Sequence, residues 1–195
     1  LFPYTTLFRS PFSNYLKQRG ISDEAAEEFG LGYAPTGEFR DRVTYPLYNA
    51  SGVLVGWTGR RVSSEEYEET NSGKRFVPKY KNSAESALFH KDELLFGLKQ
   101  ARAEIQKRDC VYIVEGQNDV IRMWMSGFKN TFAGSGTAFG EKQARLLQRF
   151  TRNAVIMYDG DDAGRKATLR TMRLLLVAGF SVSVCVVPDK EDPDS

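Results

Sequence analysis

The chain has 195 residues, of which 41% are hydrophobic and 27% are charged, and its formal net charge is +2. These proportions are ordinary for a soluble globular protein, and the length suffices for one large domain or two small ones. No apolar run approaches the roughly 20 residues of a membrane-spanning helix, and the N-terminus lacks the basic-then-apolar order of a secretory signal. We therefore expect a cytoplasmic protein with no membrane partner.

The inventory of histidine and cysteine limits the metals that the chain can bind. His90 is the one histidine, and Cys110 and Cys185 are the two cysteines, with no Cys-x-x-Cys pair. Both cysteines flank or occupy apolar strand-like runs, which predicts buried thiols rather than a disulfide. A zinc site of the usual Cys and His type is effectively excluded.

The N-terminal region predicts two short helices. Residues 1–10 (LFPYTTLFRS) fit no structural pattern, and we expect a non-native or disordered leader. Residues 12–19 predict a helix that Gly20 ends. Ser22 then caps a second helix, which Gly30 stops.

A mainly β region follows, beginning with an extended segment at 32–35. Runs at 43–48 and 53–58 flank Asn49-Ala50-Ser51-Gly52, which is a hairpin signal. The polar stretch 63–74 is expected to be a mobile surface loop. A third strand-like run at 75–80 closes this region.

Basic and aromatic residues alternate in the segment 74–91. It holds one acid and five basic residues, with Phe76, Tyr80 and Phe89 between them. A groove for single-stranded nucleic acid requires such interleaving, although a plain amphipathic strand explains the spacing almost as well.

From Cys110 onwards, strand-like runs alternate with helical patterns. A helix from about Asp92 to Ile105 links the two halves. The predicted strands are 111–114, 130–133, 154–158 and 181–187. The predicted helices between them are 118–126, 139–150 and 163–178, the last with Leu169, Met172, Leu175 and Leu176 on one face. The expected fold class is therefore α/β, with an α+β subdomain over 11–108 and a Rossmann-like domain with a four-stranded parallel sheet over 109–195.

Carboxylates follow three of these strands at the same edge of the sheet. Alone, Asp159 and Asp161 are best interpreted as solvated turn residues, with Asp162 as a helix cap. Glu115 changes this interpretation, because the carboxyl ends of parallel strands meet where open α/β sheets bind ligands. Oxygen donors of this kind select hard cations, so Mg²⁺ or Mn²⁺ is expected, with two ions about 4 Å apart serving a phosphoryl displacement.

Two basic residues follow this acidic turn, and two interpretations of them remain open. Arg165 and Lys166 stand at the start of the next helix, where they fit either a phosphate substrate or a solvated helix face.

The C-terminal half contains four acidic or glycine-rich motifs, which are Val114-Glu115-Gly116-Gln117-Asn118-Asp119-Val120-Ile121, Gly136-Thr137-Ala138, Asp159-Gly160-Asp161-Asp162-Ala163-Gly164-Arg165 and Asp192-Pro193-Asp194. Together they resemble the toprim domain, which bacterial primases, topoisomerases and certain nucleases share. The N-terminal half contains the motifs Tyr15–Glu24, Phe39–Leu47, Gly59-Arg60, Pro78–Ser83 and Leu88–Lys91. This half resembles the catalytic core of DnaG-type primases.

The resemblance implies roles for particular residues. The catalytic residues and central metal ligands are then Glu115, Asp159 and Asp161, with two or more Mg²⁺ or Mn²⁺ ions. Asp119, Asp192 and Asp194 are then expected to support these ligands or to bind further ions. The resemblance also implies a basic groove that holds the template, nascent RNA or nucleoside triphosphate. Its lining residues are then Arg42, Arg60, Lys79 and Lys91, with Tyr80 and Asn82 beside it.

The implied activity is template-directed synthesis of short RNA primers on single-stranded DNA by nucleotidyl transfer. Ribonucleoside triphosphates, the RNA primer and a replicative helicase are the other implied partners. The chain departs from the family pattern in lacking a preceding zinc ribbon and a following helical subdomain with its helicase-binding region. The stretch 63–74 looks like an insertion between the Arg60 and Lys79 motifs, and Gln117-Asn118 replaces the more usual Tyr-Met pair.

Two other functions are weighed against this one. A toprim-type metal-dependent nuclease would use the same acids to activate water, but nucleases of this kind lack the basic motifs found here from Arg42 to Lys91. A non-catalytic fragment that binds single-stranded nucleic acid is disfavoured by the intact set of acids.

Overall fold

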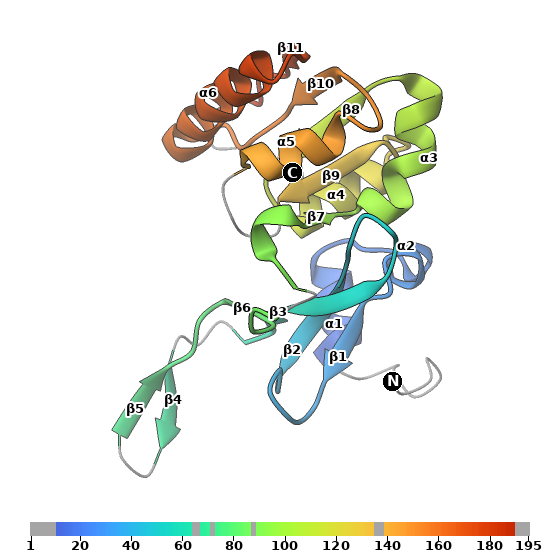
Figure 1. Ribbon diagram of the computed structural model, residues 1–195. Helices are drawn as coiled ribbons and strands as arrows, with labels where there is room; N and C mark the ends of the chain where they lie inside the picture. Colours follow the sequence, from blue (N-terminus) through green and yellow to red (C-terminus); the bar gives the residue numbers. More distant parts are fainter. Residues whose placement is uncertain (1–10, 64–66, 71–72, 87–88, 135–138, 190–195) are drawn as a thin grey trace. The chain divides into compact units, whose positions relative to one another are not determined.

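The computed structural model describes residues 11–63, 67–70, 73–86, 89–134 and 139–189 (Figure 1). The chain divides into two compact units, one within residues 1–46 and 56–84 and the other within 47–55 and 85–195. None of the helices in the described ranges combines the length and the apolar character that a membrane crossing requires. The predicted division into a subdomain over 11–108 and a domain over 109–195 is not tested by these units and stays a prediction.

The first unit combines two short helices with a four-stranded sheet of order β1-β2-β3-β6 (Figure 1). The predicted helices and their caps are confirmed: Gly20 has a φ of 58°, and Ser22 Oγ accepts a hydrogen bond from Ala25 N at 3.1 Å. The elements are α1 (Pro11–Gln18), α2 (Asp23–Glu28), β1 (Gly32–Ala34), β2 (Arg42–Tyr48), β3 (Leu54–Arg61) and β6 (Tyr80–Asn82).

The predicted turn between β2 and β3 is also confirmed. The side chain of Asn49 organises it, because its Oδ1 accepts hydrogen bonds from Ser51 N and Val53 N at 3.0 Å each. Gly52 takes a φ of 81°, which only glycine adopts without strain.

The prediction of a mobile surface loop over 63–74 is wrong for the part of this stretch that the structure describes, apart from residue 63. Strands β4 (Tyr67–Thr70) and β5 (Gly73–Phe76) form a two-stranded antiparallel hairpin. Its register places Tyr67 opposite Phe76 and Glu68 opposite Arg75. A ring pair and an opposite-charge pair stabilise such a ladder, although the polar composition of the stretch gave no strand signal.

The predicted strand at 75–80 is divided between two sheets. Its first residues belong to β5, and Tyr80 begins β6, which pairs with β3. Pro78 lies between the two strands and has no N–H to continue a ladder.

The second unit is built on a five-stranded sheet of order β11-β10-β8-β9-β7. The four predicted parallel strands are confirmed as β8 (Val111–Val114), β9 (Thr131–Gly134), β10 (Asn153–Ile156) and β11 (Ser181–Val184). A fifth strand that we did not predict, β7 (Leu95–Phe96), pairs antiparallel with β9 at the edge.

The helix predicted from Asp92 begins later than expected. A single turn, η2 (Lys91–Glu93), and strand β7 come first, and α3 (Leu98–Arg108) starts after Gly97. The φ of 89° at Gly97 interrupts any continuous helix at this point.

Helices pack on this sheet and enclose one apolar core. The predicted helices are confirmed as α4 (Gln117–Met125), α5 (Glu141–Leu147) and α6 (Asp162–Val177). Helices α3 and α4 contact β9, and α6 contacts β10 and β11. The most enclosed core side chains, each with 0% exposure, are Ala101, Ile105, Val111, Ile113, Phe132, Leu147, Ile156 and Leu175.

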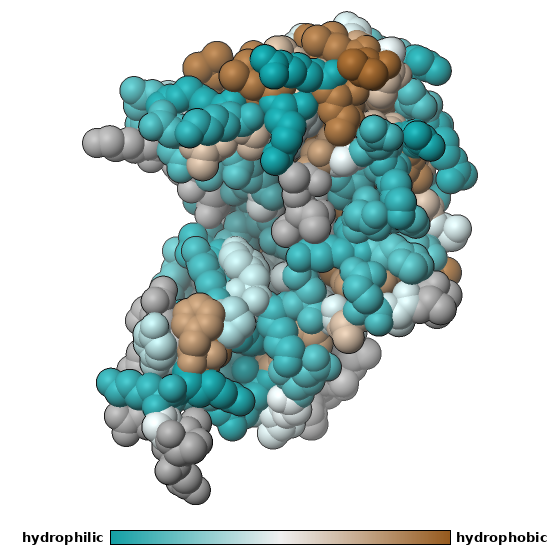
Figure 2. Space-filling view, turned by 60° about the vertical axis from the view of Figure 1, so that its left-hand side comes forward, coloured by the Kyte–Doolittle hydropathy of each residue, from teal (hydrophilic) through white to brown (hydrophobic). Residues whose placement is uncertain are grey.

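The apolar face expected on α6 is only partly buried. Leu175 is fully enclosed, whereas Leu169 and Leu176 are each 52% exposed. These two are seven residues apart and share a face, and the stripe that meets the sheet runs beside it through Gly164, Thr171 and Leu175. Figure 2 shows apolar side chains gathered at the upper end of the view.

The expectation of buried thiols is wrong for Cys185 and only partly met by Cys110. Cys110 and Cys185 are both free, but Cys110 is half-buried and Cys185 is exposed. Cys185 directly follows β11, the strand at the opposite edge of the sheet from β7.

Substitution of two leucines on α6 tests this assignment of its faces. We expect Leu175→Ala to lower the free energy of unfolding by about 2–5 kcal/mol, because it opens a cavity in the core. Leu169→Ala on the exposed face should change it by no more than about 0.5 kcal/mol. Urea unfolding followed by circular dichroism measures both, and equal losses would contradict the assignment.

Candidate active site

The acidic residues that follow β8 and β10 lie together at the carboxyl ends of these two strands. The two strands are neighbours and parallel, with Ile113 paired to Ile156. Glu115 and Asp159 follow them, and the backbone N–H of Asp159 donates a hydrogen bond to Glu115 Oε1 at 3.3 Å. The register of the sheet thus brings together two of the predicted metal ligands, which are 44 residues apart in the chain.

Asp161 is the N-cap of helix α6. Its Oδ1 accepts a hydrogen bond from Gly164 N at 2.7 Å, so the capping role that we considered for Asp162 belongs to Asp161. A carboxylate is favourable here because the helix N-terminus carries partial positive charge.

Asp119 also acts as a capping residue. It is buried, and its Oδ2 accepts a hydrogen bond at 2.7 Å from the backbone N–H of Gly116, the N-cap of α4. This contact fixes the turn that immediately follows Glu115, so Asp119 supports the position of Glu115 through the backbone.

The carboxylates repel one another electrostatically. Partial burial, followed by repulsion from Asp159 and Asp161, raises the pKa of Glu115 above its ordinary value, and the hydrogen bond from Asp159 N opposes the rise. A divalent cation would relieve this repulsion, and carboxylate oxygens are the donors that hard cations prefer.

No group of three Asp, Glu, His or Cys side chains among the described residues is arranged as a metal-ligand cluster. Glu115, Asp119 and Asp161 each direct one carboxylate oxygen to a backbone N–H. The remaining predicted ligands, Asp192 and Asp194, lie outside the described residues.

Two glycines allow the acidic turn to pack closely against its surroundings. A Cβ at Gly160 would lie 1.9 Å from the carbonyl oxygen of Pro188. A Cβ at Gly164 would lie 2.1 Å from the Asp159 carbonyl oxygen and 2.9 Å from Glu115 Oε1. Because real Cβ contacts are essentially never this short, a side chain at Gly160 must displace this turn or the backbone at Pro188, and one at Gly164 must displace the backbone of Asp159 or its own helix start.

Arg165 connects the acidic turn to the segment after β11. Its Nη1 donates hydrogen bonds to the Gly160 carbonyl oxygen at 2.6 Å and to Asp189 Oδ1 at 2.8 Å, and its Nη2 donates to Asp162 Oδ1 at 3.1 Å. The two interpretations of Arg165 stay open, because its side chain is 53% exposed, and these contacts add a positioning role. The sequence could have predicted its ion pair with Asp162, because residues three apart on a helix are neighbours on its surface.

In the first unit, two of the predicted basic residues are buried. Arg42 is 4% exposed, and its guanidinium donates to the carbonyl oxygens of Gly59, Lys79 and Pro78 at 3.3, 3.1 and 2.8 Å. Arg60 is 6% exposed and lies 5.6 and 5.5 Å from the ring centres of Tyr15 and Tyr80. Both cations therefore organise the sheet and the segment that precedes β6.

Lys79 and Tyr80 present the accessible part of this basic group. Both side chains are exposed, and the Lys79 Nζ lies 5.9 Å from the Tyr80 ring centre. Desolvation and then repulsion from Arg60, Arg19 and Arg61 lower the pKa of Lys79, and the repulsion shows that cations surround it.

Asn82 lies on the same strand as Tyr80, and Lys91 belongs to the other unit. Asn82 Oδ1 accepts a hydrogen bond from Thr58 Oγ1 at 2.6 Å, and the cross-strand pairs Thr58–Asn82 and Arg60–Tyr80 share one face. Lys91 lies in the turn η2 of the second unit. The binding roles assigned to these residues stay predictions.

Comparison with known proteins gives two family matches in separate segments. Residues 109–186 match the toprim domain, and residues 36–102 match the N-terminal domain of the DNA primase catalytic core. The chain is 36% identical to the DNA primase of Aquifex aeolicus, over 93% of this chain and 41% of that protein.

Solved structures agree with these matches. A DNA primase domain from Pseudomonas aeruginosa superposes with a TM-score of 0.84 at 31% identity, over 98% of this chain and 68% of that one. A DnaG primase catalytic domain bound to single-stranded DNA superposes with a TM-score of 0.81 at 29% identity, over 95% of this chain and 66% of that one.

The parallel sheet with acidic strand ends, together with the matched segment, defines a toprim-domain protein, and this class implies the use of a divalent metal. Within the class, the chain belongs to the DnaG-type DNA primases and corresponds to their catalytic core. It spans 41% of the length of the Aquifex aeolicus relative and 34% of that from Staphylococcus epidermidis.

The sign of a stability change at Gly164 tests the close packing of the acidic turn. Helix propensity alone would make Gly164→Ala stabilising by about 1 kcal/mol. Contact of the new methyl group with the Asp159 carbonyl oxygen reverses the sign, so we expect a loss of about 1–3 kcal/mol in the free energy of unfolding. Ala163→Gly at the exposed neighbouring position is the control and should cost about 1 kcal/mol through propensity. A Gly164→Ala variant that is as stable as the parent would refute the contact.

The repulsion among the carboxylates predicts a pH-dependent stability. An acid whose pKa is raised by folding binds its proton more tightly in the folded state, so its ionisation destabilises the fold as pH rises through the raised pKa. In buffer that contains a chelator at pH 7, the Glu115→Gln variant should therefore have a higher melting temperature than the parent protein. The difference should vanish below about pH 4, where Glu115 is protonated in both the folded and unfolded states. A lower melting temperature for the variant at pH 7 would contradict the repulsion.

Proposed function

We propose that this chain is the catalytic core of a DNA primase, which joins ribonucleotides into short RNA primers on a single-stranded DNA template. The observation that carries the proposal is the convergence of Glu115 with the Asp159-Gly160-Asp161 turn at one edge of a toprim sheet. The identity to proteins named DNA primase supports it, and so does the DNA held by one similar catalytic domain.

Glu115, Asp159 and Asp161 are the residues that would hold Mg²⁺ or Mn²⁺, and Asp119 holds the turn after Glu115 in place. Two such ions supply charge stabilisation for the attacking and leaving oxygens of a phosphoryl transfer. The donor set fits this group, because it consists of carboxylates whose mutual repulsion a cation offsets. Asp192 and Asp194 stay in the proposal as supporting ligands.

In the proposed reaction, the 3′-hydroxyl oxygen of the primer forms a bond to the α-phosphorus of a ribonucleoside triphosphate. The bond from that phosphorus to the bridging oxygen breaks, and pyrophosphate leaves. Lys79 and Lys91 would bind phosphate groups of template or nucleotide, and Tyr80 would stack on a base. Arg42, Arg60 and Asn82 would hold the segment that presents Lys79 and Tyr80.

The partners follow from this reaction. Ribonucleoside triphosphates and the RNA primer are its substrates together with the DNA template, and a replicative helicase is the expected protein partner. A primase acts on replicating DNA, so we place the protein in the cytoplasm.

Primer synthesis on single-stranded DNA tests the proposal. With labelled ribonucleotides and Mg²⁺ or Mn²⁺, we expect an RNA product that Glu115→Gln and Asp159→Asn each reduce by more than about 100-fold, the upper end of losses for residues that only support metal ligands. Glu141→Gln, an exposed acid in α5, is the matched control and should retain the product.

Two other outcomes would overturn the assignment. Metal-dependent cleavage of the template would establish the nuclease instead. Binding of DNA with no reaction under any metal would leave a nucleic-acid-binding module.

A further inference from the structure

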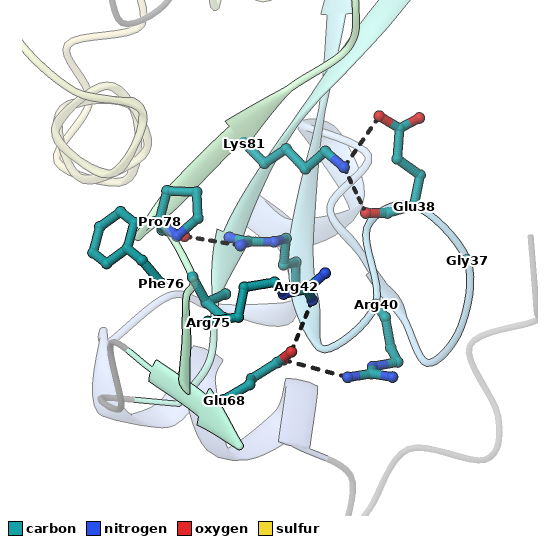
Figure 3. Close-up of a pocket in the computed structure, with 10 residues that line it drawn as sticks. Gly37, Glu38, Arg40, Arg42, Glu68, Arg75, Phe76, Pro78 and Lys81 are labelled. Carbon is teal, nitrogen blue, oxygen red and sulfur yellow. Dashed lines mark hydrogen bonds and ion pairs between the residues drawn. The ribbon is translucent and has the colours of Figure 1, made fainter. Parts of the chain in front are cut away.

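A pocket of about 520 Å³ opens in the first unit, beside the base of the β4–β5 hairpin (Figure 3). Its volume lies within the range of small-ligand sites. Arg42 is the one predicted binding residue that lines it, and the hairpin overlaps the stretch 63–74, which we expect to be an insertion relative to the primase pattern. Residues of the lining are Gly37, Glu38, Arg40, Arg42, Glu68, Arg75, Phe76, Val77, Pro78 and Lys81.

The lining carries a surplus of positive charge. Four of its side chains are basic and two are acidic, so an anionic ligand is favoured. The basic residues are Arg40, Arg42, Arg75 and Lys81, and the acidic ones are Glu38 and Glu68.

Two arginines from different segments hold the carboxylate of Glu68. Arg40 Nη2 donates to Oε1 at 3.3 Å, and Arg75 Nη2 donates to Oε2 at 2.9 Å. Figure 3 shows both guanidiniums converging on Glu68. One cation on each oxygen is also the arrangement in which arginines bind the two free oxygens of a phosphodiester.

This carboxylate is replaceable. The side chains of Arg40 and Arg75 are 57% and 68% exposed, and that of Glu68 is 36% exposed. Ion pairs at such exposure contribute little to stability, so a phosphodiester of equal charge can take the place of Glu68 on the same two arginines.

Exposed aromatic rings lie next to these arginines. Phe76, which lines the pocket, is 57% exposed, and Tyr67 opposite it is 54% exposed. Their ring centres are 5.8 Å apart in an edge-to-face arrangement, which the hairpin register fixes. Open rings beside cations are the combination by which proteins bind single-stranded nucleic acid without sequence preference.

We propose that the β4–β5 hairpin and its pocket form an additional contact for single-stranded DNA, with a phosphodiester on Arg40 and Arg75 and a base on Phe76. Glu68 occupies the phosphate position until the strand displaces it. The inference rests on the proposed function only in taking single-stranded DNA as the partner.

Binding of a fluorescent oligothymidylate, measured by anisotropy over a series of salt concentrations, tests the contact. Arg75→Ala should lower the affinity and reduce the salt slope by about 0.7, the contribution of one phosphate on a single strand. Phe76→Ala should weaken binding about fivefold or more through lost stacking. Glu68→Gln should instead tighten binding, because it removes the anion that competes with the phosphate.

The opposite signs at Glu68 and Arg75 separate binding from structure. If the ion pair served only to hold the hairpin together, both substitutions would weaken binding equally, and that result would overturn the proposal. The matched controls are Glu141→Gln and Arg145→Ala, an exposed ion pair of 3.3 Å on α5, which should leave affinity and slope unchanged.

Two further arms identify the ligand and separate this inference from the proposed function. Competition by free ATP that abolishes the effect of Arg75→Ala would assign the pocket to nucleotides and overturn the assignment to a strand. Weaker binding with Lys79→Ala, but parent affinity with Arg75→Ala and Phe76→Ala, would overturn the hairpin contact and leave the primase proposal intact. If the parent protein makes no primer but the hairpin substitutions change DNA binding as expected, only the proposed function is overturned.

Discussion

Repulsion between carboxylates at one edge of the toprim sheet is the constraint on which the rest of the site depends. Glu115 and Asp159 are brought together by adjacent strands, and Asp161 follows at the next helix. Backbone N–H groups compensate part of this negative charge, because they donate to Glu115 and Asp161. The N-terminus of α6 adds partial positive charge at the same place. The site is therefore held by the backbone, which keeps the acids in position before any cation is bound.

Backbone contacts also determine which residues can surround these acids. Gly160 and Gly164 are required because the turn packs directly against carbonyl oxygens. Arg165 connects the acidic turn to the segment after β11, because its guanidinium donates hydrogen bonds to the carbonyl oxygen of Gly160 and to the Asp189 carboxylate. A residue at this site can thus be essential without being a metal ligand, and its loss would displace the carboxylates.

The first unit uses arginine in a different way. Arg42 and Arg61 donate to carbonyl oxygens of the segment 77–79, and Arg60 lies against tyrosine rings. Because carbonyls and rings leave the positive charge uncompensated, Arg60 and Arg61 still repel the Lys79 ammonium, and this repulsion adds to desolvation in lowering its pKa. Structural and binding roles are joined here by electrostatics, since a guanidinium stays charged even when its donors are occupied.

The sequence by itself determined the parallel strands, their helices and the acids at the strand ends, because these follow from apolar periodicity and from residue order along one chain. It also carried the motifs that resemble primase cores. It did not reveal the β4–β5 hairpin, because the ladder depends on cross-strand pairs such as Tyr67 with Phe76 inside a polar stretch. Only the tertiary structure decided that Glu115 meets Asp159, that Arg42 and Arg60 are buried, and that Arg40 and Arg75 meet at Glu68. Those facts depend on which distant segments come into contact, and residue spacing does not encode that information.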